Sequence, residues 1–350
     1  MFSTLFDPYL RFAFWTAIGA VVLATLAAAL IVHLRFGLIR RTRREHAFQS
    51  VWRPILVEAL VSTPVSPLPI LLPGDRVFFL SLWVQLQLSV RGTQAPGLQD
   101  VAYRVGCDKF AAALLRHGNP PEKLLAILSL GLLRDRSAWS LLVGIARETP
   151  PIRSFCALNA LVQIDAEAAA AELTPLLLAR NDWPMARIAA LLQGVRAAFA
   201  GPLLRAAEDA EGRRLIKILR LIEVLRLQLP VPTLSRLLSD KQPAEVIIGA
   251  LRATFVPGLL PQVRALPGHP DWRVRVQVCK VLGRLGEFQD IVPLSNLLSD
   301  REWWVRYCAA CALVGLPFVR RSQLDQLRCS VSDPLAREVL EHVLFEKAPS

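Results

Sequence analysis

Few of the residue types that hold metals or act as nucleophiles lie close together in the sequence. Histidine occurs at 33, 46, 117, 269 and 342, and cysteine at 107, 156, 279, 308, 311 and 329. Only Cys308 and Cys311 form a close pair. Zinc requires four ligands, and a redox Cys-x-x-Cys pair normally begins a helix beside a strand. We therefore expect these thiols to lie in an apolar core, and we expect neither a metal nor a cofactor.

Sequence motifs for catalysis are also missing. The sequence contains no Gly-x-Ser-x-Gly nucleophile motif, no phosphate-binding loop, and no Gly-x-Gly-x-x-Gly after a strand. No pair of carboxylates has a spacing that indicates acid–base catalysis. The sequence therefore predicts a protein that is not an enzyme.

Tryptophan and arginine recur together behind acidic residues. The four sets are Asp182-Trp183-Pro184 with Arg187, Asp271-Trp272 with Arg275, Glu302-Trp303-Trp304 with Arg306, and Asp333-Pro334 with Arg337. Trp183, Trp272, Trp303 and Trp304 are candidates to bind a partner, or to stack on bases or sugars. The favoured interpretation of the charged residues is structural: a ladder that bridges neighbouring units, formed by Asp182, Arg187, Asp271, Arg275, Arg306, Asp333 and Arg337.

The spacing of these sets predicts a repeated unit. Arg275 and Arg306 are 31 residues apart, and Arg306 and Arg337 are again 31 apart. A fixed period in this range indicates stacked supersecondary units. In the clearest copy, Val274, Val278 and Leu282 lie on one helical face after Pro270. A second apolar run covers 291–298, and we expect Ser299-Asp300 to cap the next unit.

Weaker copies of the unit begin near Pro120, Pro150 and Asp182. They give about seven units over residues 118–348, the last of them a partial cap. No segment alternates polar and apolar residues like a strand over a useful length. The sequence therefore predicts an all-α fold in which paired helices are stacked.

The turn acid, the Val-Arg pair and the Ala/Leu/Val core resemble HEAT repeats, in particular the short bacterial variety called PBS-lyase HEAT-like. The resemblance covers about two thirds of the chain and is strongest over 269–348. It implies a right-handed α-solenoid with a binding role, and a ladder role for the Val-Arg arginine. Iron-binding HEAT enzymes have His-Glu pairs on successive repeats, and no histidine here precedes a glutamate. A HEAT-like lyase or hydroxylase therefore remains only an alternative.

Residues 12–34 predict a transmembrane helix. These 23 residues have no formal charge and would span roughly 34 Å as a helix, enough for a bilayer core. Five arginines follow at 35, 40, 41, 43 and 44, whereas only Arg11 precedes the span. The positive-inside rule then places residues 1–11 in the periplasm and the C-terminal part in the cytoplasm, at a bacterial inner membrane. A cleaved signal peptide is the alternative, but its charge would lie on the other side.

The basic linker, 35–44, is expected to contact anionic lipid through Arg35, Arg40, Arg41, Arg43 and Arg44. Residues 45–117 are expected to form a helical cap over the first repeat. The predicted cap has helices at about 45–61, from an Asp75 cap to Ser89, and from Gly97 to His117. A proline-rich loop, 63–74, separates the first two. The alternative is that this loop contacts a membrane partner.

A second resemblance concerns function. The span, the basic linker, Trp52-Arg53-Pro54, the Leu71-Leu72-Pro73 loop and Glu302-Trp303-Trp304-Val305-Arg306-Tyr307 resemble proteobacterial membrane-anchored HEAT proteins. That family is associated with a neighbouring polysaccharide-synthase-type glycosyltransferase. The resemblance implies a non-catalytic accessory subunit of an exopolysaccharide synthase, with a polytopic glycosyltransferase as partner.

The rival is a nucleic-acid-binding solenoid. Of the net charge of +12, five charges belong to the linker, which leaves +7 for the rest of the chain. This excess is modest, and a membrane anchor argues against a nucleic-acid partner, so we expect none.

Overall fold

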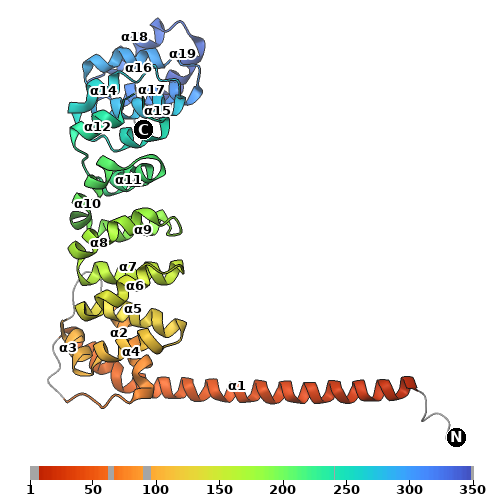
Figure 1. Cartoon of the computed structure of the whole chain (residues 1–350). Helices are drawn as coiled ribbons and strands as arrows, with labels where there is room; N and C mark the ends of the chain where they lie inside the picture. Colours follow the sequence, from red (N-terminus) through yellow and green to blue (C-terminus); the bar gives the residue numbers. More distant parts are fainter. Residues whose placement is uncertain (1–7, 62–66, 90–95, 240, 348–350) are drawn as a thin grey trace. The chain divides into compact units, whose positions relative to one another are not determined.

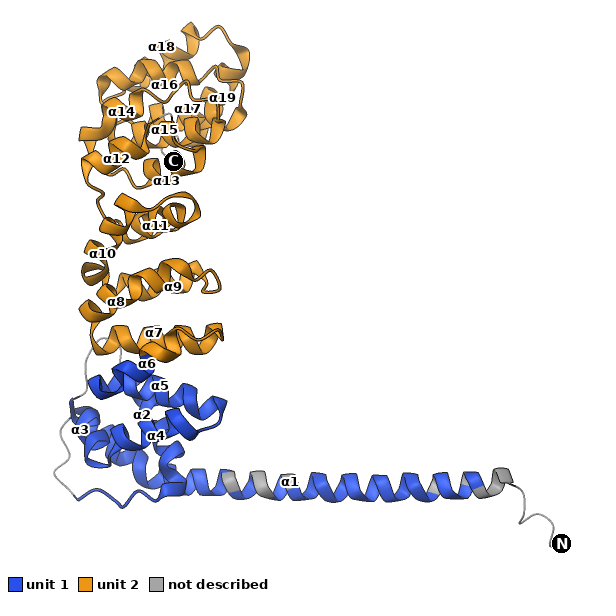
Figure 2. Cartoon of the chain, viewed as in Figure 1, with its two compact units in different colours: residues 1–142 blue, residues 143–350 orange. Residues whose placement is uncertain are grey.

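The computed structural model describes residues 8–61, 67–89, 96–239 and 241–347. All regular structure in these residues is helical, and no strand occurs among them. The prediction of an all-α fold is confirmed. The chain forms two compact units, residues 1–142 (unit 1) and 143–350 (unit 2), which Figure 2 shows in different colours.

Unit 1 is built around the C-terminal part of a long first helix (Figure 1). Its helices are α1 (Pro8–Val61), α2 (Arg76–Ser89), α3 (Pro96–Arg104), α4 (Cys107–His117) and α5 (Pro120–Leu133). Helix α1 packs against α2 and α3, and α5 packs against α2 and α4. The ring centroids of Trp52 and Phe79 lie 4.9 Å apart in the core. Buried Trp83 donates its indole N–H to the carbonyl of Leu98 at 2.8 Å.

Helix α1 is continuous through the predicted span, the basic linker and the predicted helix at 45–61. Its segment Phe14–His33 is long and apolar enough to cross a membrane, and none of it is buried in the fold. A signal sequence near an N-terminus would meet the same criteria. Phe48 is the first residue of α1 that is buried in unit 1. It follows His33 by 15 residues, a helical rise of roughly 22 Å.

The structure corrects two expectations for residues 45–117. Asp75 does not cap α2 but lies in the 3₁₀ turn Pro73–Asp75, where its carboxylate accepts a hydrogen bond from Arg44. The predicted helix from Gly97 to His117 is two helices, because Gly106 adopts a left-handed conformation with φ 76°. Residues 62–66 of the proline-rich loop, residues 1–7 of the predicted periplasmic segment, and 348 at the end of the predicted repeats lie outside the described residues.

Unit 2 is a succession of short helices. Helix α6 (Trp139–Ala146) spans the division between the units. The others are α7 (Pro151–Ile164), α8 (Ala166–Ala179), α9 (Met185–Gln193), α10 (Arg196–Asp209), α11 (Gly212–Leu225), α12 (Val231–Leu237), α13 (Ala244–Arg252), α14 (Leu260–Arg264), α15 (Trp272–Leu285), α16 (Ile291–Leu297), α17 (Trp303–Gly315), α18 (Arg321–Ser330) and α19 (Pro334–Glu346). Each odd-numbered helix from α9 to α19 contacts the next odd-numbered one. These helices therefore form one continuous layer.

The 31-residue period appears directly in the C-terminal helices. Helices α15, α17 and α19 begin at Trp272, Trp303 and Pro334, and the predicted core positions behind these starts are buried. Helices α15 and α17 approach so closely that a Cβ on Gly283 would lie 2.8 Å from the Cβ of Ala312. Asp300 differs from the expectation, because it bonds the Glu302 N–H ahead of α17 while Glu302 itself is the N-cap residue.

The repeat arginine is mainly a clamp on its own turn. Arg275 donates to the carbonyls of His269 and Pro270 at 2.8 and 3.1 Å. Arg306 makes the same two bonds to the carbonyls six and five residues before it, and Arg337 makes the first of them. Each arginine therefore fixes the entry to the helix that carries it.

The predicted ladder between units is largely wrong. Only Arg275 reaches the next unit, through two bonds of 2.7 and 2.8 Å to the Asp300 carboxylate. The position 31 residues after Asp300 is Val331, which has no carboxylate to offer Arg306. Asp271 and Asp182 pair instead with Arg273 and Arg180. Asp333 caps α19 through the Leu335 N–H, and Arg187 is exposed with no ion pair in the described part of the chain.

Four other cations link the hairpins by capping helix ends. Arg180 donates to the carbonyls of Ala146 and Thr149 at the end of α6, at 3.3 and 3.1 Å. Lys217 does the same for α8, Arg236 for α10 and Arg284 for α13. The last four carbonyls of a helix have no partner within it, and the C-terminal end is electronegative. Cations from later helices therefore satisfy these groups.

We predict that Arg275 matters far more to stability than its neighbour Arg273. Arg275 and Asp300 are buried, so Arg275→Ala leaves an unpaired carboxylate in the interior and should lower the free energy of unfolding by about 3–5 kcal/mol. Arg273→Ala, which removes an exposed ion pair, should cost less than about 1 kcal/mol. Urea unfolding of both full-length variants, followed by circular dichroism, measures the difference. Equal losses would contradict the assigned role.

The buried carboxylates also predict acid sensitivity. Burial alone would raise the pKa of Asp290 and Asp300, but hydrogen bonds from Arg264 and Arg275 hold both below the usual value. A depressed folded-state pKa gives stability that is present above the unfolded pKa of about 3.9 and is lost as pH falls through the lower folded value. The unfolding free energy should therefore decline below about pH 4. The decline should be shallower in Asp300→Asn, which a pH series of denaturant curves would detect.

Candidate partner-binding surface

The structure separates the four candidate tryptophans. Trp183 is only 3% exposed and donates its indole N–H to Ser154 Oγ at 3.1 Å. Phe155 contacts its ring, and the Arg180 guanidinium lies over it at 4.8 Å. Trp183 is thus a core residue, and the expectation that it binds a partner is wrong. Sequence alone missed this because Trp183 lies two residues before α9 begins.

The other three tryptophans are exposed. Trp272, Trp303 and Trp304 keep 38%, 45% and 55% of their surface accessible. They occupy the first turns of α15 and α17, where burial starts only at Val274 and Val305. The helix starts thus place these large apolar side chains at the surface.

Trp303 and Trp304 form an aromatic cluster with Tyr307. The Trp303 and Tyr307 rings are stacked at 5.2 Å, and the Trp303 and Trp304 rings meet edge to face at 4.8 Å. The Tyr307 hydroxyl donates to Glu346 at 3.0 Å, and this bond raises the tyrosine pKa to about 12. Sequence analysis did not select Tyr307 as a site residue, although it lies one helical turn after Trp303.

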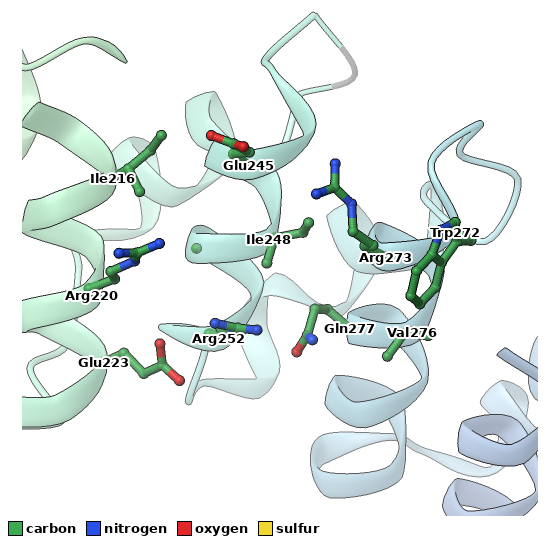
Figure 3. A pocket seen from close by; sticks show the side chains of 11 residues that line it. Ile216, Arg220, Glu223, Glu245, Ile248, Arg252, Trp272, Arg273, Val276 and Gln277 are labelled. Atoms are coloured by element: carbon green, nitrogen blue, oxygen red, sulfur yellow. The ribbon is translucent and has the colours of Figure 1, made fainter. Parts of the chain in front are cut away.

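A groove of about 380 Å³ lies beside the aromatic residues (Figure 3). It crosses α11, α13 and α15, with Ile216, Ile248 and Val276 among its apolar lining residues. Gly249 also lines it, and a Cβ there would lie 2.9 Å from Leu219 Cδ1. Because α13 has no side chain at this point, it can approach α11 closely.

The charged lining of the groove is mainly basic. Arg220, Arg252 and Arg273 line it together with Glu223 and Glu245 (Figure 3). Arg273 pairs with Asp271, but Arg220 and Arg252 form no ion pair with any residue in the described ranges. These two guanidiniums are therefore available to an acidic ligand.

A second hollow of about 310 Å³ lies between α17 and α19 and is lined by Trp303, Arg306, Leu335, Glu338 and His342 among others. Trp272 lines the groove, and Trp303 lines the second hollow. The two hollows and the aromatic cluster thus belong to one layer of helices, α11 to α19. We name this combined area the docking surface.

Among the linker arginines, the structure describes exposed side chains for Arg35, Arg40, Arg43 and Arg44. The side chain of Arg41 lies outside the described set. Arg44 is the one linker arginine for which an acid partner, Asp75 at 2.8 Å, is described. The linker therefore carries its cations on a helix rather than on an irregular segment.

Metal and redox chemistry receive no support from the described residues. They contain no group of three or more histidine, cysteine and carboxylate side chains placed to hold a metal. Burial raises the pKa of Cys279 and Cys308, so both thiols are neutral at physiological pH. Comparison with protein-family models found no matching family, and comparison with curated proteins found no match.

We predict that the buried and the exposed tryptophans contribute differently to stability. Trp183→Ala opens a cavity and leaves the Ser154 hydroxyl without its donor, and should cost about 3–5 kcal/mol. Trp304→Ala removes a largely exposed side chain and should cost less than about 1 kcal/mol. Thermal or urea unfolding of the two variants tests this. A large loss for Trp304→Ala would show that it is structural.

Proposed function

We propose that the protein is a non-catalytic scaffold that binds a partner protein at a membrane. The observation that carries the proposal is the exposed cluster of Trp303, Trp304 and Tyr307, one helix away from a groove with two unpaired arginines. Tryptophan, tyrosine and arginine are the residue types enriched at the energetic centres of protein interfaces. An acidic partner segment with an apolar anchor would complement both features.

The proposed architecture is a HEAT-like α-solenoid. Its support is the 31-residue register of α15, α17 and α19 and the continuous layer of odd-numbered helices. Such stacks bind partners across an extended face instead of in a closed cavity. The docking surface occupies one such face.

The proposed location is the inner membrane, with a single span and the second unit in the cytoplasm. The unburied apolar segment Phe14–His33 supports the span, and the excess of arginine after it supports the orientation. A cleaved signal sequence is the competing interpretation. Continuity of α1 into the core of unit 1 supports retention, since Trp52 and Leu56 of the same helix are buried there.

The partner that we propose first is a polytopic membrane glycosyltransferase of the polysaccharide-synthase type. This choice rests on the sequence resemblance, and the accessory role in exopolysaccharide synthesis follows from it. A nucleic acid is the second candidate, because Arg220, Arg252 and Trp272 could contact phosphates and a base. The glutamates in the same groove disfavour it.

The test is capture of partners by the full-length tagged protein from its native membranes in mild detergent, with identification by mass spectrometry. We expect the wild-type protein to recover a glycosyltransferase. Trp303→Ala/Trp304→Ala should reduce recovery by about thirtyfold, the effect of losing one energetic centre of roughly 2 kcal/mol.

Matched control variants define the outcome. Phe288→Ala/Val292→Ala removes two exposed apolar side chains from the 3₁₀ turn Phe288–Asp290 and from α16, outside the docking surface, and should leave recovery unchanged. Equal loss in both double variants, or no membrane protein recovered, would overturn the proposal. Tight DNA binding that weakens with salt and with Arg220→Ala/Arg252→Ala would favour the nucleic-acid alternative.

A further inference from the structure

Unit 1 contains a hollow directly beyond the apolar segment of α1. It has a volume of about 380 Å³ and is lined by Arg40 and Arg44 of α1, by Gly74, Val77 and Phe78, and by Glu122 of α5. Its lining thus combines two cations, one carboxylate and an apolar wall. No role has been assigned above to this combination.

Arg44 is fixed in position on one side of the hollow. Its Nε donates to Asp75 Oδ1 at 2.8 Å. Gly74 is required for this arrangement, because a Cβ there would lie 2.8 Å from the Arg44 Nη2 atom. Arginine has five N–H donors, so the bond through Nε leaves the terminal nitrogens free to bind an anion.

Arg40 lies on the same face of α1, one turn closer to the apolar segment. It is exposed and forms no ion pair with the residues that the structure describes. Two guanidiniums one turn apart, one of them held in place, are suited to the oxygens of a single phosphodiester.

Glu122 supplies the opposite charge. Its Oε2 accepts the Asn119 backbone N–H at 2.9 Å in a capping box, while Oε1 has no partner among the described residues. A carboxylate beside two arginines disfavours ligands with several negative charges. It suits a ligand whose anionic group is followed by an ammonium group.

The position of the hollow indicates where such a ligand comes from. Arg40 follows His33 by seven residues, a helical rise of roughly 10 Å, and the headgroup layer is about 5–7 Å thick on each side of the bilayer core. An extended arginine side chain covers the remaining distance. Phe36, exposed and one turn before Arg40 on the same face, can lie against the acyl chains.

We propose that this hollow binds the headgroup of phosphatidylethanolamine, with the phosphate at Arg40 and Arg44 and the ammonium at Glu122. The proposal rests on the membrane span in the proposed function. It differs from general attraction to anionic lipid, which would treat all linker arginines alike and would favour phosphatidylglycerol.

The test uses the full chain reconstituted in vesicles of equal phosphatidylethanolamine and phosphatidylglycerol. After transfer to mild detergent, native mass spectrometry counts the lipids that remain bound. Wild type should retain phosphatidylethanolamine in preference. Arg40→Gln/Arg44→Gln should retain about tenfold less. Arg40→Gln alone, which leaves the Arg44–Asp75 pair intact, should also lose lipid.

Two variants make the test specific. Arg35→Gln/Arg43→Gln removes the same charge from linker positions outside the hollow, and should bind as wild type does. Glu122→Gln keeps a side chain that can maintain the capping box, and should shift the preference towards phosphatidylglycerol. Preference of the wild type for phosphatidylglycerol, or equal loss in both double variants, would overturn the site.

A preceding flotation assay separates this proposal from the proposed function. Failure of the wild type to remain with vesicles after alkaline carbonate treatment would remove the membrane span and both proposals with it. Stable integration without retained phosphatidylethanolamine would remove the lipid site alone. Competition by soluble phosphoethanolamine would show that the headgroup suffices for binding.

Discussion

The stacking of short helices depends on how their unpaired C-terminal carbonyls are satisfied. Each helix of unit 2 ends after a few turns, so a large share of its backbone oxygens has no partner within the helix. Arg180, Lys217, Arg236 and Arg284 donate to the ends of α6, α8, α10 and α13. A cation is suited to this position because the C-terminal end of a helix is electronegative. These contacts join hairpins that lie about 30 residues apart, and they give polar specificity to an interface that is otherwise aliphatic.

The basic balance of the chain therefore has three structural uses. Part of it lies in the linker, part caps helix ends, and part, including Arg220 and Arg252, remains unpaired in the groove. Only the last part is free for a macromolecular partner of unit 2. A net charge taken from composition overstates the tendency to bind nucleic acid, because a cation that already bonds carbonyls cannot also neutralise a phosphate.

Sequence periodicity predicted the helices of the C-terminal repeats because their buried faces recur every 31 residues. It failed where one residue changes the outcome. Gly106 splits the predicted helix at 97–117 through its positive φ, which composition does not signal. The acid in the turn was expected to bridge units, but Asp182 and Asp271 bind arginines within two residues, since local pairs form with little loss of chain entropy. Trp183 and Trp272 have the same local motif and opposite burial. The difference arises from the preceding hairpin, where Ser154 and Phe155 receive Trp183.

The exposed aromatic cluster is best explained by binding, because folding does not require it. Burial of a tryptophan contributes several kcal/mol, yet Trp303 and Trp304 leave about half of their surface in water. Their rings pack mainly on each other and on Tyr307, and Glu346 orients Tyr307 from the end of α19. The cluster is therefore ordered before any partner arrives, which lowers the entropy cost of association. The neighbouring groove supplies charge selection through Arg220 and Arg252. An apolar anchor with a fixed orientation beside a site that selects charge gives a surface both affinity and specificity.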